Sequence, residues 1–222
     1  MVAPLVEVRG VSKTYRRGAE RVHALRGVSL SVQPGELVAL VGPSGSGKSS
    51  LLSVVAGWEA PDAGRLEWAP GLAAGAALPW SALSMIPQAL GLLEDLSVRE
   101  NVTLPARLRR GGDRTEAGRA EELLGLFGLE ELADRVPSET SLGQQQRAAV
   151  ARALLLGPRL LLADEPSAHQ DTVWVHDVFA ALRRATQEHG GACLVATHDP
   201  KALPFADRVL SLRDGTLEEV ST

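Results

Sequence analysis

Residues 42–49 read Gly-Pro-Ser-Gly-Ser-Gly-Lys-Ser, so three glycines precede a lysine and a serine. Glycine lets the backbone wrap closely around an anion with several N–H groups pointing inward, which suits a polyphosphate. In such a loop Lys48 reaches the β- and γ-phosphates and the Ser49 hydroxyl ligates Mg²⁺. The residues expected around the phosphates are Gly42, Pro43, Ser44, Gly45, Ser46, Gly47, Lys48, Ser49 and Ser50. The spacing therefore predicts a site that holds a nucleotide together with magnesium.

Residues 42–49 could also be a glycine-rich turn that binds no ligand. The segments before and after them favour a phosphate-binding loop. The apolar residues 37–41 before it predict a buried strand, and residues 50–55 after it have the composition of a helix. A helix N-terminus adds positive partial charge at the place where the phosphates would lie. The order of strand, loop and helix therefore favours nucleotide binding.

Two adjacent carboxylates follow a second apolar run. Asp164 and Glu165 come directly after residues 160–163, which read Leu-Leu-Leu-Ala. The carboxyl end of a buried parallel strand faces the ligand crevice of an open α/β sheet. We therefore predict that Asp164 organises Mg²⁺ and that Glu165 is the general base that orients and polarises the attacking water. Alone, such a pair is more often a solvated strand end, and the upstream loop favours the catalytic interpretation.

The rest of the chain supplies the elements that must position these groups. Strand and helix patterns alternate without an internal repeat, which predicts an α/β fold. Residues 5–8 and 27–32 alternate apolar and polar side chains and predict antiparallel strands beside the nucleotide-binding sheet. Residues 33–36 read Gln-Pro-Gly-Glu and predict a turn at the end of the second strand.

A helical insertion is expected between the two halves of the site. Residues 116–127 carry apolar side chains at three- and four-residue spacing, namely Ala117, Ala120, Leu123, Leu124 and Phe127. Residues 69–84 are rich in Gly and Ala and contain Pro70 and Pro79, which predicts a loop or a short hairpin. We predict one domain over residues 1–222, with a core of residues 1–88 and 157–222 and a helical subdomain of residues 89–156.

Composition argues against several classes of protein. The 222 residues carry a formal net charge of −4 and no dense block of Lys and Arg, which disfavours nucleic-acid binding. No stretch approaches the ~18 apolar residues of a membrane span, and the first residues do not predict a signal peptide. Cys193, the single cysteine, has apolar neighbours and is expected to be a buried, inert thiol. We expect a cytoplasmic enzyme with no direct membrane insertion.

Several motifs occur in an order that resembles the ATP-binding-cassette (ABC) ATPases over nearly the whole chain. The positions that carry the resemblance are Tyr15, residues 42–49, Gln88, residues 141–144, residues 160–165, residues 167–171 and His198. The resemblance implies a P-loop NTPase (RecA-like) core with an N-terminal antiparallel β subdomain and an inserted α-helical subdomain. It also implies that the nucleotide is ATP, bound with Mg²⁺ as cofactor.

The resemblance assigns roles to three residues that the spacing alone does not. Tyr15 looks like the aromatic residue that stacks on adenine, although a single tyrosine could also simply pack on a strand. Gln88 looks like the glutamine that contacts Mg²⁺ and the nucleophilic water, and His198 like the switch histidine near the γ-phosphate. The implied catalytic set is Glu165, His198, Lys48 and Gln88. The implied metal ligands are Ser49, Gln88 and Asp164.

The family signature falls at Ser141, Leu142, Gly143 and Gln144. Ser-x-x-Gln is also the capping box that starts a helix, and both interpretations can hold, because a helix N-terminus is an anion site. In the resembled family this motif faces the ATP of the opposite protomer, and the loop containing Asp171 contacts the dimer partner. Two chains would then meet head to tail with two ATP molecules between them.

Two residues depart from the family pattern. Leu142 stands where the signature has its first glycine, and Gln170 stands where the dimer-contact loop usually has leucine. A bulky side chain at 142 would hinder close approach of the backbone to the opposite ATP. Ser141, Glu165 and Asp171 are retained, so we expect a working site with slower turnover.

Residues 86–102 look like the same stretch of stand-alone subunits for lipoprotein release, macrolide export and cell division. We predict an ATP-hydrolysing subunit that dimerises with itself or a paralogue and drives an integral membrane permease, peripheral on the cytoplasmic face of the membrane. The alternative is a non-transport regulator of a cell-envelope enzyme, which would use the same face. A DNA-repair ATPase is disfavoured because no long heptad insertion is present. A P-loop kinase would not need Ser141, Asp171 and His198 together.

Overall fold

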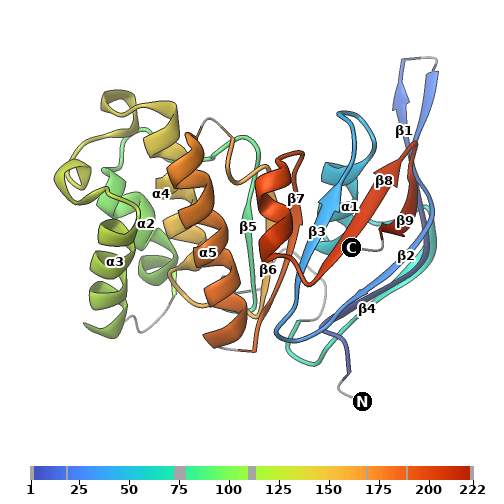
Figure 1. The fold of residues 1–222 in the computed structure, drawn as a ribbon, viewed down its shortest axis with the longest axis horizontal. Helices are drawn as coiled ribbons and strands as arrows, with labels where there is room; N and C mark the ends of the chain where they lie inside the picture. Colours follow the sequence, from blue (N-terminus) through green and yellow to red (C-terminus); the bar gives the residue numbers. More distant parts are fainter. Residues whose placement is uncertain are drawn as a thin grey trace.

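The computed structural model describes residues 3–18, 20–72, 79–109, 114–168, 170–188 and 190–220. The strands form two sheets, one of six strands in the order β5-β6-β7-β3-β8-β9 and one of three strands in the order β2-β1-β4. In Figure 1 the six-stranded sheet lies in the middle, with helices α2 to α5 on one side and the three-stranded sheet on the other. The α/β fold with a separate antiparallel sheet and a helical region is as predicted.

The six-stranded sheet is parallel except at one edge. Its strands are β3 (Leu37–Val41), β5 (Leu83–Ile86), β6 (Leu160–Asp164), β7 (Ala192–Ala196), β8 (Arg208–Arg213) and β9 (Thr216–Val220). Only β9 is antiparallel to its neighbour. Every residue of β6 and β7 is buried, as expected for parallel strands with both faces covered.

The three-stranded sheet consists of β1 (Val6–Arg17), β2 (Glu20–Val32) and β4 (Ala63–Trp68). The predicted antiparallel pairing of residues 5–8 with 27–32 is confirmed, since Val6 lies opposite Val32 and Val8 opposite Leu30. Both strands continue well beyond the predicted ranges. The predicted turn follows β2, where the Glu36 N–H donates to the Gln33 carbonyl (3.2 Å).

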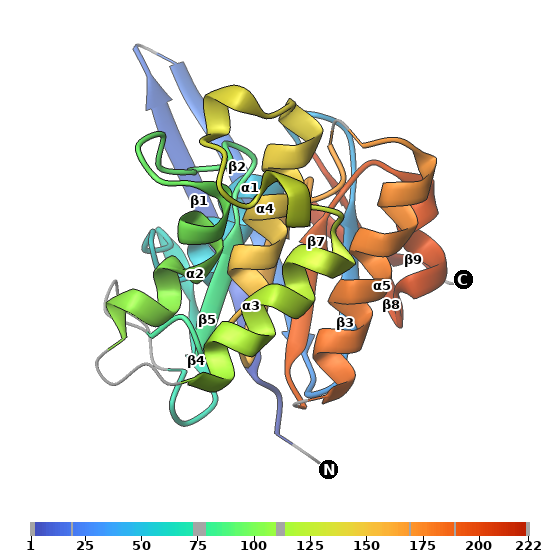
Figure 2. The ribbon, with the colours of Figure 1, turned by 90° about the vertical axis from the view of Figure 1, so that its left-hand side faces the viewer.

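Helices α2 (Val98–Leu108), α3 (Arg114–Leu126) and α4 (Leu142–Leu154) form the helical region that faces the viewer in Figure 2. Helix α5 (Thr172–Glu188) contacts α4 and strand β7, and α4 contacts strand β5, so both helices pack on the parallel sheet. Helix α1 (Lys48–Val55) packs between the two sheets. The described residues also include three short 3₁₀ helices, at Glu130–Leu132, Pro137–Glu139 and Pro200–Phe205.

Alternate side chains of the parallel strands enter two separate hydrophobic clusters. On β6, Leu161 and Ala163 pack with the helices α2 to α5, whereas Leu160 and Leu162 pack with α1 and the antiparallel sheet. This alternation follows from the two-residue period of a strand. Cys193 is fully buried in the first cluster, where burial raises the pKa of its thiol to about 12. The expectation of an inert cysteine is confirmed.

One detail of the predicted elements was wrong. The range 69–84 was expected to be a loop or a short hairpin, but Leu83 and Ser84 begin strand β5 and pair with β6. This strand has only four residues, and Ser84 is buried despite its polar side chain, so no hydrophobic period marks it. Residues 73–78 of the same range lie outside the described part of the chain. The helix predicted from the apolar spacing in residues 116–127 is present as α3, with Ala120 and Leu123 on its buried face and Ala117 exposed.

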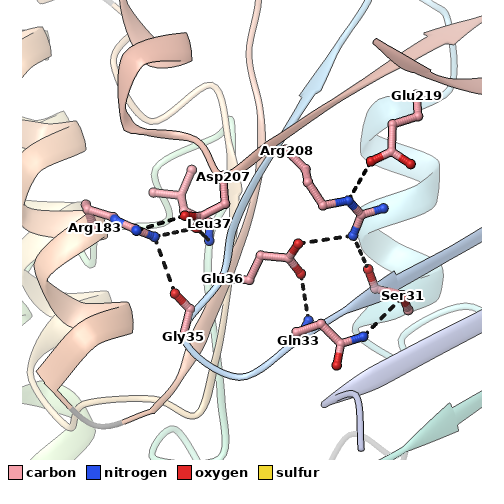
Figure 3. Close-up of polar contacts among 9 residues, drawn as sticks. All are labelled: Ser31, Gln33, Gly35, Glu36, Leu37, Arg183, Asp207, Arg208 and Glu219. Carbon is pink, nitrogen blue, oxygen red and sulfur yellow. Dashed lines mark hydrogen bonds and ion pairs between the residues drawn. The ribbon is translucent and has the colours of Figure 1, made fainter. Parts of the chain in front are cut away.

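A polar network ties together the amino ends of β3 and β8 (Figure 3). The Arg208 side chain donates to Glu36 (3.1 Å), to Glu219 (2.7 Å) and to the Ser31 carbonyl (3.0 Å). The Glu36 carboxylate also accepts from the Gln33 N–H (2.7 Å). We call Glu36, Arg208 and Glu219 with their partners the amino-end network.

A second ion pair belongs to the same end of the sheet. Arg183 of α5 donates to both carboxylate oxygens of Asp207, and one of these oxygens accepts from the Leu37 N–H (2.8 Å). In Figure 3 this pair lies on the other side of β3 from Arg208. In the part of the chain that the structure describes, no helix combines the length and the apolar character needed to cross a bilayer.

Candidate active site

A cavity of about 750 Å³ opens at the carboxyl ends of the parallel strands. This volume is in the range of small-molecule and cofactor sites. It is lined by Tyr15, Val22, Ala24, Gly42, Pro43, Ser44, Gly45, Gly47, Lys48, Ser49, Ser50, Gln88, Asp164, Glu165, Ala168 and His198. The structure thus brings together residues from five distant parts of the sequence. Of the residues predicted to surround the nucleotide, Ser46 is buried and is not among those that line the cavity.

Two glycines of the phosphate-binding loop are required by close contacts. A Cβ atom at Gly42 would lie 2.1 Å from the Leu212 carbonyl oxygen, and one at Gly47 would lie 2.2 Å from the Ala24 carbonyl oxygen. Gly47 also has a φ of 108°, which other residues rarely adopt. Since Gly47 has no side chain, the first N–H groups of α1 lack a side-chain cap. Such a helix end suits an anionic ligand.

Lys48, the first residue of α1, is held by the loop itself. Its ammonium group donates to the carbonyl oxygens of Gly42 (2.8 Å) and Pro43 (3.1 Å), and only 8% of the residue is exposed. Both acceptors are neutral, so the positive charge is hydrogen-bonded but not neutralised by these partners. A buried ammonium group of this kind favours a nearby anion.

Asp164 ends β6 and faces Ser49 at the start of α1. Burial raises the pKa of the Asp164 carboxyl group, and a hydrogen bond with the Ser49 side chain partly opposes this shift. The charge of Glu165 acts in the same direction as burial, and the charge of Lys48 opposes it. A buried carboxylate beside a hydroxyl oxygen is the kind of oxygen ligand set that Mg²⁺ takes. The donors present therefore fit a magnesium ion.

Glu165 has a backbone φ of 52°, in the left-handed region that residues with a Cβ rarely adopt. The conformation is supported by a hydrogen bond from the Glu165 N–H to the Ala196 carbonyl of β7 (2.9 Å). The carboxylate lies 2.9 Å from Nδ1 of His198, which follows β7. Backbone strain of this kind concentrates at functional sites. Two strand ends thus bring an acidic group and an imidazole together at the cavity.

Tyr15 of β1 forms part of the cavity wall. Its hydroxyl donates to the Glu59 carboxylate (2.5 Å), and the Lys13 ammonium group lies 3.5 Å from the same carboxylate. Val22 is paired with Tyr15 across the β1–β2 ladder, and Ala24 follows on the same strand. The wall is therefore aromatic and aliphatic, which suits the flat face of a nucleobase.

Residues 25–168 match the model of the ABC transporter family. This chain belongs to that family. The lipoprotein-releasing system ATP-binding protein LolD 2 of Caulobacter vibrioides is 40% identical over 98% of this chain and 98% of its own length. The macrolide export ATP-binding/permease protein MacB of Syntrophobacter fumaroxidans is 38% identical over 98% of this chain, but this region is 32% of its length. The resemblance to this group of ABC ATPases is confirmed.

Solved structures agree with this assignment. A dimeric structure of the ATP-binding cassette MJ0796 bound to ADP and Pi has a TM-score of 0.85 and 31% identity, and covers 98% of this chain. A second dimeric structure of the same bacterial ABC transporter cassette has a TM-score of 0.87. The chain is therefore an ABC ATPase that binds and hydrolyses ATP, with a P-loop NTPase fold.

The signature residues of this ABC ATPase do not line its own cavity. Ser141 caps α4 in the predicted capping box, because its side chain accepts from the Gln144 N–H (3.3 Å) and the Ser141 N–H donates to the Gln144 side chain (2.7 Å). Leu142 is 47% exposed on the first turn. Asp171 is exposed and caps α5, where it accepts from the N–H groups of Val173 and Trp174 (both 3.1 Å).

Sequence reasoning missed several residues around this ABC site. Val22 and Ala24 line the cavity without belonging to any motif, and Ala168 lines it although its motif, residues 167–171, was expected to contact the dimer partner. The strand pairing between Val22 and Tyr15 could have been inferred only from the register of a hairpin. Glu59, which holds the Tyr15 hydroxyl, is 44 residues away in sequence and carried no signal.

Proposed function

We propose that this ABC ATPase cleaves Mg-ATP in a head-to-tail dimer and thereby drives an integral membrane permease. The observation that carries the proposal is the position of Glu165. Its carboxylate lies at the cavity beside Asp164, on a strained backbone, and is held 2.9 Å from His198. A carboxylate fixed in this way can accept a proton from a water molecule that attacks the γ-phosphate.

The other cavity residues would bind and orient the nucleotide. Lys48 and the N–H groups of residues 42–49 would hold the β- and γ-phosphates. Ser49, Asp164 and Gln88 would hold Mg²⁺, which when bound neutralises charge that develops on the phosphate oxygens. Tyr15 would stack on adenine. Movement of the exposed His198 would let its imidazole donate to the γ-phosphate while Glu165 orients the water.

A dimer is proposed because one chain supplies only part of the machinery. The signature residues 141–144 and Asp171 lie outside the cavity of their own chain, and Ser141, Leu142 and Asp171 are exposed. In a head-to-tail pair, the capped N-terminus of α4 would face the partner's ATP and complete the anion site. The dimeric state of the similar cassette MJ0796 supports this arrangement. The partner would be a second copy or a paralogue.

We propose that the permease docks against residues 88–102 at the junction of the core and the helical region. This stretch begins at Gln88 of the cavity and ends in α2, and Leu93 within it is 48% exposed. A change at Gln88 on ATP binding would therefore be transmitted to the docking segment. The names of the relatives support a membrane system for lipoprotein release or export. The protein would then lie on the cytoplasmic face of the membrane as one domain with a helical subdomain of residues 89–156.

Glu165→Gln tests the proposed chemistry. This change keeps the size of the side chain but removes its basicity, so ATP binding should be retained while turnover falls roughly 10²–10⁴-fold. A dimer should then accumulate with Mg-ATP, as measured by light scattering. Glu219→Gln, at the far end of the sheet, is the matched control and should keep normal turnover. A Glu165→Gln protein with unchanged ATPase activity would exclude Glu165 as the base, and one that stays monomeric with its permease present would exclude the dimer.

The membrane partner is tested by copurification. Solubilised membranes that contain the protein should yield a complex with a permease whose cytoplasmic loops contact residues 88–102. Leu93→Asp should reduce recovery of that complex without changing ATP binding. A partner that spans the membrane but moves no substrate would instead favour a regulator of a cell-envelope enzyme.

A further inference from the structure

Gln170 connects the dimer-contact loop to the signature helix within one chain. Its side-chain nitrogen donates to the Gly143 carbonyl (2.8 Å), and its side-chain oxygen accepts from the guanidinium group of Arg147 (3.2 Å). Both halves of the amide are therefore used, and both partners lie on α4. We call these two hydrogen bonds the Gln170 bridge.

Arg147 is itself fixed in place. The residue is 8% exposed, and its guanidinium carbon lies 3.8 Å from the centre of the Trp174 ring on α5. Gly128 lies at the edge of the same ring, where an added Cβ atom would come within 2.7 Å of it. Trp174 is thus in contact with Arg147 over its ring face and with Gly128 at its ring edge. The bridge joins Gln170 to side chains that have little freedom to move.

The bridge spans the two surfaces that a head-to-tail partner would meet. Gly143 belongs to the signature, and Asp171, next to Gln170, caps α5. Leucine, the usual residue of the resembled family at position 170, has no group that could donate to Gly143 or accept from Arg147. The glutamine therefore adds a connection that the usual sequence cannot make.

We propose that Gln170 is a positioning residue that holds the signature and the dimer-contact loop in one arrangement before the partner and its ATP arrive. Preorganised surfaces associate more tightly because less freedom is lost on binding. The inference rests on the head-to-tail dimer proposed above. It assigns Gln170 to the association step and not to nucleotide binding within one chain, since Gln170 does not line the cavity.

The test replaces Gln170 by leucine in the Glu165→Gln background. The two side chains are similar in size, so the main change is the loss of two hydrogen bonds in each protomer. The dimer dissociation constant at saturating Mg-ATP, measured by analytical ultracentrifugation, should rise about tenfold. ATP affinity, measured by calorimetry at protein concentrations where the protein is monomeric, should stay the same. Gln170→Glu, which keeps an acceptor for Arg147 but cannot donate to Gly143, should also weaken the dimer.

A second readout distinguishes positioning from a general loss of structure. With Glu165 intact, the ATPase rate of Gln170→Leu should be low at low protein concentration and recover to the normal maximum at high concentration. Gln33→Leu is the matched control, because Gln33 is a half-buried glutamine in the turn after β2, far from α4. Its dimer constant should not change. Melting temperatures of all variants verify that each one is folded.

Three outcomes would overturn the inference. An unchanged or tighter dimer in both Gln170 variants would exclude the positioning role while leaving the proposed dimer intact. An ATPase rate that stays low at every protein concentration would place Gln170 in the chemical step instead. Failure of the Glu165→Gln parent to dimerise with Mg-ATP would reject the dimer itself, and the role of Gln170 with it.

Discussion

Charged side chains have different kinds of partner at the two ends of the parallel sheet. At the amino ends, Arg208 is paired with Glu36 and Glu219, so each of these charged side chains has a partner of opposite charge within the chain. At the carboxyl ends, Lys48 is hydrogen-bonded to neutral carbonyl oxygens and Asp164 to a serine hydroxyl. The charged groups at the amino end therefore already have partners in the free protein. At the carboxyl end, Lys48 can still bind a phosphate and Asp164 can still bind a cation.

The pKa shifts show the same difference. The hydrogen bonds that Arg208 donates to Glu219 and Glu36 raise the pKa of its guanidinium group and favour the charged form, and the bond to Glu219 has the larger effect. Burial raises the pKa of Asp164, and for an acid the same direction disfavours the charged form. The structure therefore stabilises the charged form of Arg208 at the amino end and destabilises the charged form of Asp164 at the carboxyl end. The cost at Asp164 would be relieved by a bound cation.

The largest expected effect comes from removing the charge at the carboxyl end. Lys48→Ala should abolish tight ATP binding and ATP hydrolysis together, because no other residue of the loop supplies a positive charge. ATP should then no longer raise the melting temperature, whereas ATP should raise that of the original protein by mass action. Lys201→Ala, an exposed lysine bonded to Thr172, is the control and should keep the ATP-dependent shift. Normal ATP binding by Lys48→Ala would contradict the proposed site.

Removing charge at the amino end should affect folding and not function. Arg208→Met leaves the mostly buried Glu36 without its ion-pair partner, which should lower the free energy of unfolding by about 1–3 kcal/mol. Urea denaturation measures this loss, and calorimetry should find an unchanged ATP affinity. Arg65→Met removes an exposed pair with Glu67 and should cost about 0–1 kcal/mol. A fall in ATP affinity in Arg208→Met as large as the fall in stability would show that the two ends are coupled.

The smallest effect is expected at the wall of the cavity. Tyr15→Phe keeps the ring but removes the hydroxyl that donates to Glu59, so the ring is less firmly oriented. ATP affinity should fall only about two- to fivefold with an unchanged maximal rate. Tyr15→Ala also removes the stacking surface, worth about 1–3 kcal/mol, and should weaken ATP binding much more. Equal losses in the two variants would show that the hydroxyl, and not the ring, determines affinity.

Local sequence was sufficient wherever the deciding interactions lie close along the chain. The phosphate-binding loop, the apolar strand before it, the helix after it and the Ser141 capping box were predicted because their rules act over a few residues. Gly42 and Gly47 were predicted from this local spacing. The atoms that exclude a Cβ there, the carbonyl oxygens of Leu212 and Ala24, belong to strands distant in sequence. The short strand β5 was missed because four residues with a buried serine carry no period.

The sequence by itself determined the family, the ATP chemistry and the residues that should perform it, since each motif is a short run with fixed spacing. Only the tertiary structure decided which distant groups meet. It paired Glu165 with His198, Tyr15 with Glu59, and Gln170 with Gly143 and Arg147. These partners are separated by 23 to 44 residues, and no local rule of backbone or side-chain geometry acts over such a distance. Their contacts follow from how the strands and helices pack.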